Sequence, residues 1–173
     1  MTAGLFLKKK SLLSEIENSN EMNRNDTINS SPIIIPENSF MDGSFSSKIS
    51  IRIEGGFTGL LYSKEKVIID DVGIVQGNII ASEIVIIGNV IGNIYCLGKV
   101  HVKNGGKMQG NIFTNRFQND EGSDLNSNIT ILNHETLIKL EEINNNITLK
   151  LGVNANTHFE DLIRFFSNET NKK

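Results

Sequence analysis

Histidines, paired carboxylates and one cysteine are the residues of this chain whose types could do chemistry. The three histidines, His101, His134 and His158, lie in different segments. A metal-dependent enzyme would need two or three such side chains converging on one ion, and their spacing indicates no such set. Asp70 and Asp71 are adjacent and could act as a carboxylate pair, although a solvated turn is the more common role. The sequence therefore predicts no catalytic residue, no metal and no cofactor.

Two glycine pairs, Gly55-Gly56 and Gly105-Gly106, could be considered for phosphate binding. A glycine-rich phosphate loop opens a helix, and neither pair precedes a helical pattern. The sequence also contains no Walker motif. Cys96 has no second cysteine with which to form a disulfide, which fits a reducing compartment. We expect Cys96 to be a small buried residue, and any assembly of this chain to proceed without nucleotide.

The charge is nearly balanced over the 173 residues, with 17 lysines and arginines against 20 aspartates and glutamates and a net charge of −3. No basic face stands out in the central part of the chain, so we expect no nucleic-acid partner. The length suits one domain with tails.

A glycine followed two residues later by an apolar residue recurs through the central part of the chain. These anchors, with a serine in the last copy, are separated by 16, 18, 15, 18 and 17 residues: Gly43, Gly59, Gly77, Gly92, Gly110 and Ser127. A recurring step of this size is typical of a solenoid, in which each repeat forms one coil of a stack.

Columns of similar residues surround each anchor. Two residues before the anchors lie Met41, Phe57, Val75, Val90, Met108 and Leu125. Two residues after them lie Phe45, Leu61, Ile79, Ile94, Ile112 and Ile129, and four after lie Ser47, Ser63, Ala81, Cys96, Thr114 and Ile131. Alternating pairs occur farther upstream: Ile33/Ile35, Ile49/Ile51, Val67/Ile69, Ile84/Ile86, Val100/Val102 and Phe117/Asn119. Such alternation of β-branched residues is typical of strands.

These columns predict short β-strands joined by bends, because a coil of roughly 17 residues cannot contain a helix, a strand and their turns. Coils stacked about 4.8 Å apart would place equivalent residues over one another around a narrow dry interior. We expect an all-β fold, a parallel β-helix (solenoid) of about six coils over residues 32–131. The columns do not determine its handedness, although the rule for parallel crossovers favours a right-handed one.

The run VIIDDVGIVQGNIIASEIVIIGNVIGNIYCLGKVHVKNGGKMQGNIFTNRF, residues 67–117, resembles the bactofilins, a family of bacterial polymer-forming cytoskeletal proteins. The resemblance covers about residues 33–131. It rests on the Gly-Asn-Ile steps that begin at Gly77, Gly92 and Gly110, on Ala81-Ser82, and on Thr114 through Phe117.

The resemblance implies a right-handed β-helix that polymerises end to end without nucleotide. It also implies a scaffold for cell shape or for the placement of cell-wall enzymes, in the cytoplasm at the inner face of the cytoplasmic membrane. The partners would then be further copies of the chain, the membrane surface and cell-wall synthesis or hydrolysis proteins.

The first ten residues, MTAGLFLKKK, could bind a membrane surface. They are too short to be a signal peptide or a membrane span. Three apolar residues would enter the interface and three lysines would meet anionic lipid: Leu5, Phe6, Leu7, Lys8, Lys9 and Lys10. Many members of the family carry such a peptide, whereas an ordinary disordered start is the alternative. Composition predicts that the whole segment 1–31 is disordered.

Residues 132–173 form a C-terminal extension with a different pattern. Asn133 to Ile143 could form a short helix. A capping-box pattern at residues 157–160 begins an amphipathic helix over about 157–167, with Phe159, Leu162, Ile163 and Phe166 on one face. We expect this helix to cover the last coil, because a β-solenoid must cover or use its ends. A docking helix for a partner is the alternative.

Aromatic residues are concentrated near the two ends of the repeats. Phe40 and Phe45 lie near one end, and Phe113 and Phe117 near the other. We predict that these four phenylalanines form a polymerisation interface. Phe117 is the strongest candidate because it begins the strand pair of the final coil. Plain core filling is the alternative for each of them.

Three functions are compatible with the sequence. The first is a cytoskeletal filament and scaffold, and the second is a left-handed hexapeptide-type acyltransferase. That enzyme fold needs an apolar residue every six positions, and steps of 15 to 17 residues break this register. The third is a monomeric β-helix that binds a partner on one face. We favour the filament.

Overall fold

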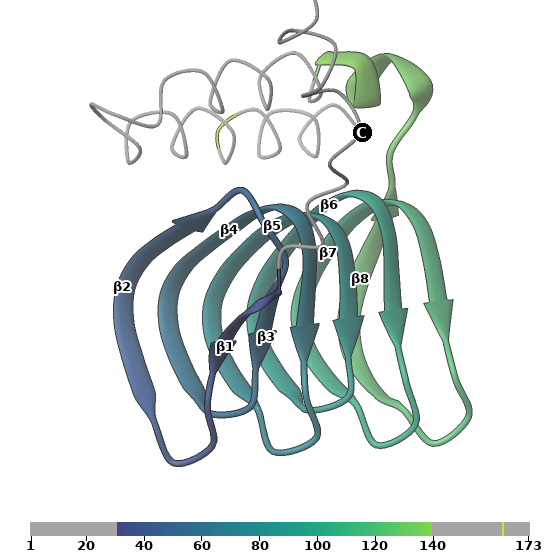
Figure 1. The fold of residues 1–173 in the computed structure, drawn as a ribbon. Coiled ribbons are helices and arrows are strands. Elements are labelled where there is room, and N and C mark those ends of the chain that lie inside the picture. Colours follow the sequence, from purple (N-terminus) through teal and green to yellow (C-terminus); the bar gives the residue numbers. More distant parts are fainter. Residues whose placement is uncertain (1–30, 140–163, 165–173) are drawn as a thin grey trace, which may run out of the picture. The chain divides into compact units, whose positions relative to one another are not determined.

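The computed structural model describes residues 31–139 and residue 164, and its fold is a parallel β-sheet wound into a solenoid (Figure 1). The sheet runs in the order β1-β3-β4-β5-β6-β7-β8, with β2 paired to β4. Its strands are β1 (Ile33–Ile35), β2 (Phe40–Ser47), β3 (Ile51–Ile53), β4 (Gly56–Ile69), β5 (Ile74–Ile86), β6 (Asn89–Val102), β7 (Lys107–Asn119) and β8 (Asp124–Ile131). The predicted all-β parallel solenoid is confirmed.

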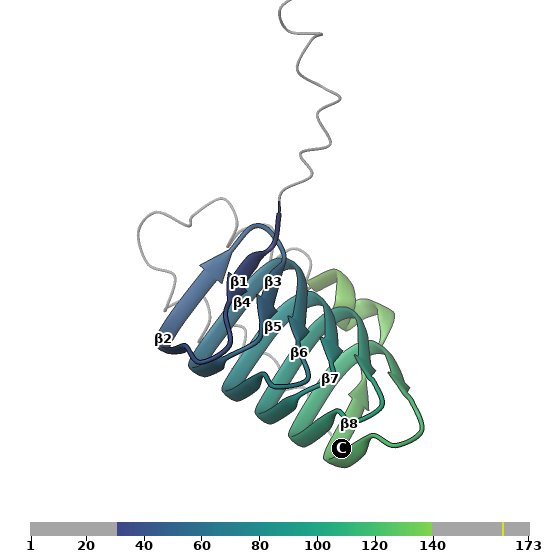
Figure 2. The ribbon, with the colours of Figure 1, turned by 60° about the horizontal axis from the view of Figure 1, so that its bottom comes forward.

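The anchor residues of the repeat stack directly on one another. The register pairs each anchor with the next along one column: Gly43, Gly59, Gly77, Gly92, Gly110 and Ser127. These positions mark the six coils, which Figure 2 shows lying side by side. The spacing of the anchors in the sequence is therefore the length of one coil.

The unequal coil lengths arise at bends and turns. The bend inside β4 takes two residues, Lys64 and Glu65, whereas the bend inside β5 takes only Ser82. The turn after β4 has four residues (70–73), and the turn after β5 has two (87–88). The 15-residue step occurs where the short bend and the short turn fall in one coil.

The alternating pair of the second coil lies two residues later than the sequence pattern indicates. That pattern indicates Ile49 and Ile51, but β1 pairs with Ile51 and Ile53. Ile49 instead lies in the bend before β3, where its carbonyl accepts hydrogen bonds from the hydroxyls of Ser47 and Ser63, each at 3.0 Å. The prediction for this pair was wrong because Ile49, Ile51 and Ile53 all fit a period of two.

The three columns around the anchors fill the interior of the solenoid. In the middle coils their side chains are at most 2% exposed: Phe57, Leu61, Val75, Ile79, Ala81, Val90, Ile94, Cys96, Met108, Ile112 and Thr114. Cys96 is thus the small buried residue that the sequence predicts. Burial raises the pKa of its thiol to about 11.

The small column also provides hydrogen-bond donors for backbone carbonyls at the bends. The hydroxyl of Thr114 donates to the carbonyl of Gly98 at 3.1 Å, and the thiol of Cys96 contacts the carbonyl of Ser82 at 3.4 Å. A buried carbonyl without a partner would cost about 1–3 kcal/mol. Small polar residues are therefore suited to these corners, where the strand ladder is interrupted.

Glycine is required in the anchor column by close packing as well as by conformation. Gly92 has a φ of 143°, and a Cβ added there would lie 1.9 Å from the carbonyl oxygen of Gly77. The last anchor, Ser127, has no positive φ, and its hydroxyl donates to the carbonyl of Met108 at 3.0 Å. The backbone of the last coil therefore departs from the repeat.

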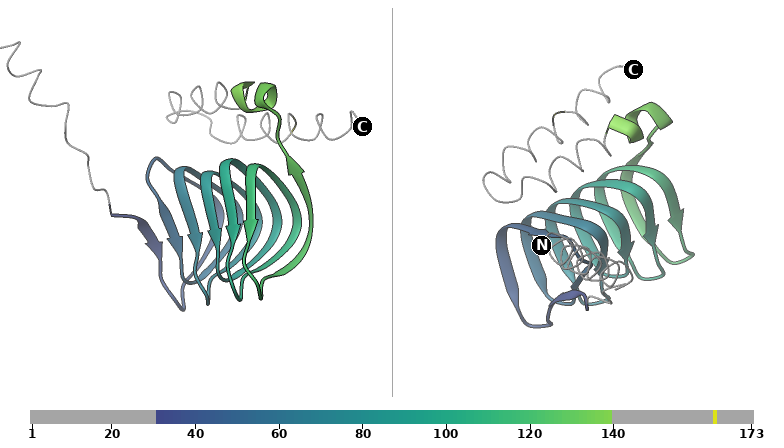
Figure 3. Two further views of the ribbon diagram at one scale, coloured as in Figure 1. Left: turned by 90° about the vertical axis from the view of Figure 1, so that its right-hand side faces the viewer. Right: turned by 45° about the horizontal axis from the view of Figure 1, so that its top comes forward.

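The chain leaves the stack after β8. The N–H of Leu132 donates to the carbonyl of Thr114 at 2.9 Å, and a helix follows over residues 134–139. Asn133 caps this helix, because its Oδ1 accepts a hydrogen bond from the N–H of Thr136 at 2.8 Å. Figure 3 shows the helix beside the coils and not across their open end.

The first part of the helix expected over 133–143 is confirmed. Its remainder, the amphipathic helix expected over 157–167 and the N-terminal tail with its membrane peptide lie outside the described residues, apart from residues 31 and 164. Within the part of the chain that the structure describes, no helix has the length and apolar character needed to cross a membrane.

Candidate assembly surfaces

Both ends of the stack have strand edges that no described strand pairs with. At the N-terminal end, β1 pairs with β3 and β2 pairs with β4. At the C-terminal end, β8 pairs with β7. Backbone N–H and C=O groups on such edges can bond to a further strand. Each end therefore offers a template on which the sheet could continue.

Core columns are open to solvent at the C-terminal end. Ile129 continues the column of Ile112 and is 41% exposed, whereas Ile112 is 0% exposed. Ile131, in the small column, is 58% exposed. Phe117 is the last residue of the column that contains Val100, and it is partly buried against the core. These residues occupy columns that form the core in earlier coils, but no further coil of the described chain stacks on them.

The N-terminal end is open in the same way. Met41, in the column of the buried Phe57, is 37% exposed, and Phe45 is partly buried against the core. Phe40 is 69% exposed, but its column continues with Gly56 and the exposed Ile74, outside the core. A Cβ added at Gly43 would meet no atom within 4 Å, whereas one at Gly59 would lie 2.1 Å from the carbonyl oxygen of Gly43. At the anchor, the second coil packs against the backbone of the coil before it. No described residue packs on the first coil in this way.

The four aromatic residues predicted for the interface lie in three places. Phe40 and Phe45 are in the first coil, and Phe117 is at the other end. Phe113 lies apart from these, on the outer side of β7. It is 8% exposed, and its ring stacks on Tyr95 with centroids 5.2 Å apart. The structure thus brings three of the four to the ends of the stack.

An asparagine ladder runs along one side of the solenoid, and sequence reasoning missed it. Each member follows an anchor by one residue: Asn78, Asn93, Asn111 and Asn128. The side-chain amides of the last three members each donate to the Oδ1 of the asparagine in the preceding coil, at 3.1, 2.8 and 3.3 Å. The recurring Gly-Asn step was the signal that could have predicted it.

The turns carry ion pairs that the sequence pattern does not indicate. The guanidinium of Arg52 bonds to Glu54 and Asp70, and the hydrogen bond to Glu54 raises the pKa of Arg52. Asp70 and Asp71 form part of the turn, since their carboxylates accept the N–H groups of Asp71 and Val72. The prediction of a turn for this pair is confirmed.

His101 lies on the outer face of β6, between the buried Val100 and Val102. Its Nε2 is 2.8 Å from Oδ1 of Asp120, and its side chain is 14% exposed. The hydrogen bond with His101 lowers the pKa of Asp120. His101 is therefore paired with a carboxylate one coil away, which the linear sequence does not show.

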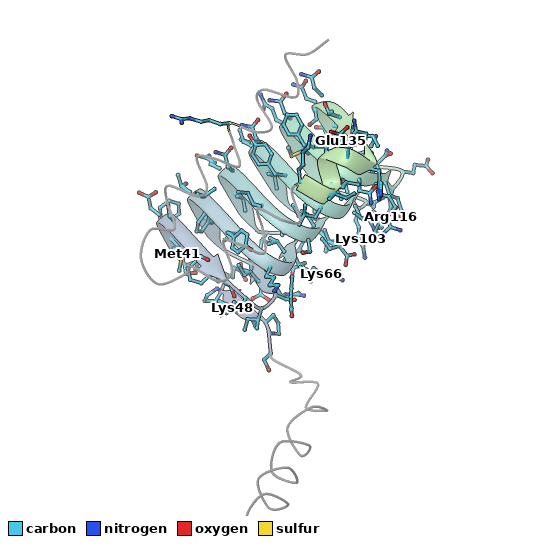
Figure 4. The ribbon with its side chains drawn as sticks, turned by 90° about the horizontal axis from the view of Figure 1, so that it is seen from above. Met41, Lys48, Lys66, Lys103, Arg116 and Glu135 are labelled. Carbon is cyan, nitrogen blue, oxygen red and sulfur yellow. The ribbon has the colours of Figure 1, made fainter. Side chains whose placement is uncertain are left out.

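Charged side chains of both signs lie along one edge of the stack. Figure 4 shows Lys48, Lys66 and Arg116 there in chain order. In the register, Lys66 pairs with Glu83, and their side chains are 3.1 Å apart. Among the described residues this edge is of mixed sign. None of the described residues form a group of three or more His, Cys, Asp and Glu that could hold a metal ion.

The fold and its two open ends define the class of this protein, a β-solenoid whose coils can be continued. Residues 33–130 match the sequence model of the bactofilin family, whose description is polymer-forming cytoskeletal. Because the match spans more than half of the chain, the protein belongs to the bactofilin family. No curated protein and no solved structure matched the chain.

Proposed function

We propose that this bactofilin polymerises end to end, with each copy continuing the stacked sheet of the next, and that the filament is a scaffold at the inner face of the cytoplasmic membrane. The family is one of polymer-forming cytoskeletal proteins. The observation that supports the end-to-end geometry is the uncovered core at both ends of the solenoid, because Met41 at one end and Ile129 and Ile131 at the other belong to columns that are buried in the middle coils.

The energetics favour such a contact. Covering one large aliphatic side chain contributes roughly 1.5–3 kcal/mol. The C-terminal end offers Ile129, Ile131 and Phe117, and the N-terminal end offers Phe40 and Met41. Strand pairing would add directional hydrogen bonds across the junction. Contacts that join copies without closing a ring produce a filament.

Membrane association would come from residues 1–10. A single small apolar patch binds a bilayer marginally, but many patches along one polymer act together. A filament could therefore remain on an anionic surface that a single copy would leave. A scaffold of this kind would hold cell-wall synthesis or hydrolysis proteins along its length.

Two other functions remain as alternatives. A hexapeptide-type acyltransferase would need acyl-transfer activity, and a binding module would remain monomeric. The family match favours the filament over both. Negative-stain microscopy of the purified chain in buffer without nucleotide distinguishes the filament from the two alternatives.

The decisive experiment for the end contact compares Phe117→Arg with Gln118→Arg. Phe117 is packed against the core at the open end, whereas Gln118 is the next residue and is exposed. We expect wild type and Gln118→Arg to sediment as filaments and Phe117→Arg to remain in the supernatant as short species. Equal sedimentation of the two variants would remove Phe117 from the interface.

Flotation with vesicles tests the membrane role separately. Filaments of the full chain should float with vesicles that contain anionic phospholipid and should float less as salt concentration rises. Replacement of Leu5, Phe6 and Leu7 by serine should abolish flotation and leave sedimentation of the filaments unchanged. Flotation that survives this replacement would exclude residues 1–10 as the membrane contact.

A further inference from the structure

An apolar stripe lies on the outside of the solenoid. It consists of the residues three positions after four successive anchors, and the register places them in one column: Tyr62, Ile80, Tyr95 and Phe113. We call this column the outer stripe. It is a feature of the side of the stack and not of its ends.

The outer stripe points away from the core. Ile80, for example, lies between Ile79 and Ala81, and successive residues of a strand face opposite sides of a sheet. Ile79 and Ala81 belong to the buried core cluster. None of the four stripe residues belongs to that cluster. Each of them is nevertheless between 0% and 8% exposed.

The column itself cannot account for this burial. Ile91, which also points outward from β6, has a neighbour in register on each side and is still 39% exposed. Stacking on the next coil therefore leaves the outer surface of a side chain open. Tyr95 on the same strand is 4% exposed, and burial raises the pKa of its hydroxyl. Something besides the sheet covers the outer stripe.

The path of the chain makes the C-terminal extension the candidate for this cover. Thr130 follows Phe113 in the column of the outer stripe, and the chain leaves the stack immediately afterwards. Leu132 and Thr136, in the segment that follows, are 8% and 6% exposed. The N-terminal segment, by contrast, joins the solenoid at β1, whose residues lie in a different column.

The extension has a suitable apolar face. Phe159, Leu162, Ile163 and Phe166 recur at the spacing of one helix face. Arg164, the one described residue of this segment, is helical and exposed. It lies between apolar positions in sequence but off their common face. A helix with this pattern buries one side and leaves arginine in water.

We propose that the amphipathic segment of residues 157–167 packs along the outer stripe, so that the C-terminal extension covers the side of the solenoid and leaves both ends free. In this arrangement the extension does not terminate the stack. It protects an apolar surface that would otherwise attract other chains. The inference does not depend on polymerisation, since it concerns one copy of the chain.

The chain provides its own reporter for this contact. It has two tyrosines and no tryptophan, and both tyrosines are in the outer stripe. Tyrosine fluorescence therefore reports on the stripe, and quenching by acrylamide measures its exposure. In the full chain we expect weak quenching. The double variant Phe159→Asp, Phe166→Asp should raise the quenching constant several-fold, because the charged side chains cannot occupy an apolar contact.

Arg164→Ser is the matched control, because it changes an exposed position of the same segment. It should leave quenching as in wild type. Circular dichroism of each variant should keep the β signal, and sedimentation should show that filaments still form, so that loss of this contact is distinguished from loss of the end contact.

Four outcomes would overturn the proposal. The first is a quenching constant of the double variant that equals that of wild type. The second is a quenching constant that rises in Arg164→Ser as well. The third is strong quenching after deletion of residues 2–30, which would identify the N-terminal segment as the cover. The fourth is quenching that rises on dilution of wild type, which would identify a second copy.

Discussion

The side-chain amide of Asn111 donates a hydrogen bond to Oδ1 of Asn93 across 2.8 Å, from one coil to the preceding one. Asn93 in turn donates to Asn78 at 3.1 Å. One residue therefore takes part in two bonds of the asparagine ladder, and its removal leaves a donor and an acceptor without partners.

This relationship makes Asn93→Ala the most informative change in the ladder. Its neighbours are partly buried, so we expect the free energy of unfolding to fall by about 1–3 kcal/mol. Gln109→Ala changes an exposed outward position of β7 and should alter stability by no more than about 0.5 kcal/mol. Urea denaturation below the assembly concentration measures both. Equal effects would mean that the ladder adds nothing beyond the sheet.

Alanine at two anchor glycines should have different consequences. Gly92→Ala places a Cβ 1.9 Å from a backbone oxygen, so we expect insoluble or unfolded protein. Gly43→Ala meets no atom within 4 Å and should cost only the strain of its positive φ, about 1–2 kcal/mol. Circular dichroism of the soluble fraction tests this difference.

Gly43→Ala also tests the N-terminal end contact. If a further copy packs on the first coil, the added Cβ meets it, and sedimentable polymer should decrease while the fold is retained. Unimpaired sedimentation would indicate that the junction does not bring a backbone close to Gly43. Ser44→Ala, at the next and exposed position, is the control.

The thiol of Cys96 should be inert in the folded protein. It is 0% exposed, and burial raises its pKa to about 11, so the reactive thiolate is scarce at pH 8. We expect a chromogenic disulfide reagent to label it only as the chain unfolds. A raised pKa contributes stability that is lost as the pH rises from the unfolded value of about 8.5 toward 11. Rapid labelling in buffer would show that the coil around Cys96 opens locally.

The hydrogen bond between His101 and Asp120 should make the stability of the fold depend on pH in the acid range. The pKa of Asp120 is lowered, so its contribution to stability is present above the unfolded value of about 3.9 and is lost as the pH falls through the folded value. Thermal unfolding of Asp120→Asn should therefore occur at a lower temperature than that of wild type near pH 6. The two should converge in acid, once the pH has fallen below the lowered pKa of Asp120. A difference that persists in acid would point to packing instead of charge.

Much of the fold could be predicted because one pattern is repeated in register. The anchor and core columns recur at every coil, so their buried positions follow from the sequence. The prediction that Ile49 and Ile51 form the strand pair was wrong, because Ile49 is an apolar residue in a bend that fits the alternation of a strand. The asparagine ladder and the bond from His101 to Asp120 depend on which residues face each other across coils, and the step between coils varies from 15 to 18 residues.

The candidate assembly surfaces were less predictable. A column residue at the end of the stack looks like core in the sequence, and only the missing next coil makes it a surface. The positions of Phe117, Phe40 and Phe45 in the end coils could be predicted because these residues flank the repeat; their part in an interface stays a prediction. Phe113 could not be assigned to the side of the stack without knowing which of its neighbours points inward.

Backbone hydrogen bonds in this fold run along the axis of the stack, so tension along the molecule loads every bond at a coil boundary together. Twelve residue pairs join each boundary from β4 to β7, whereas eight join β7 to β8. Under stretching force the molecule should separate first at the β7–β8 boundary. The C-terminal coil is therefore the part of each molecule where a fibre under tension should break.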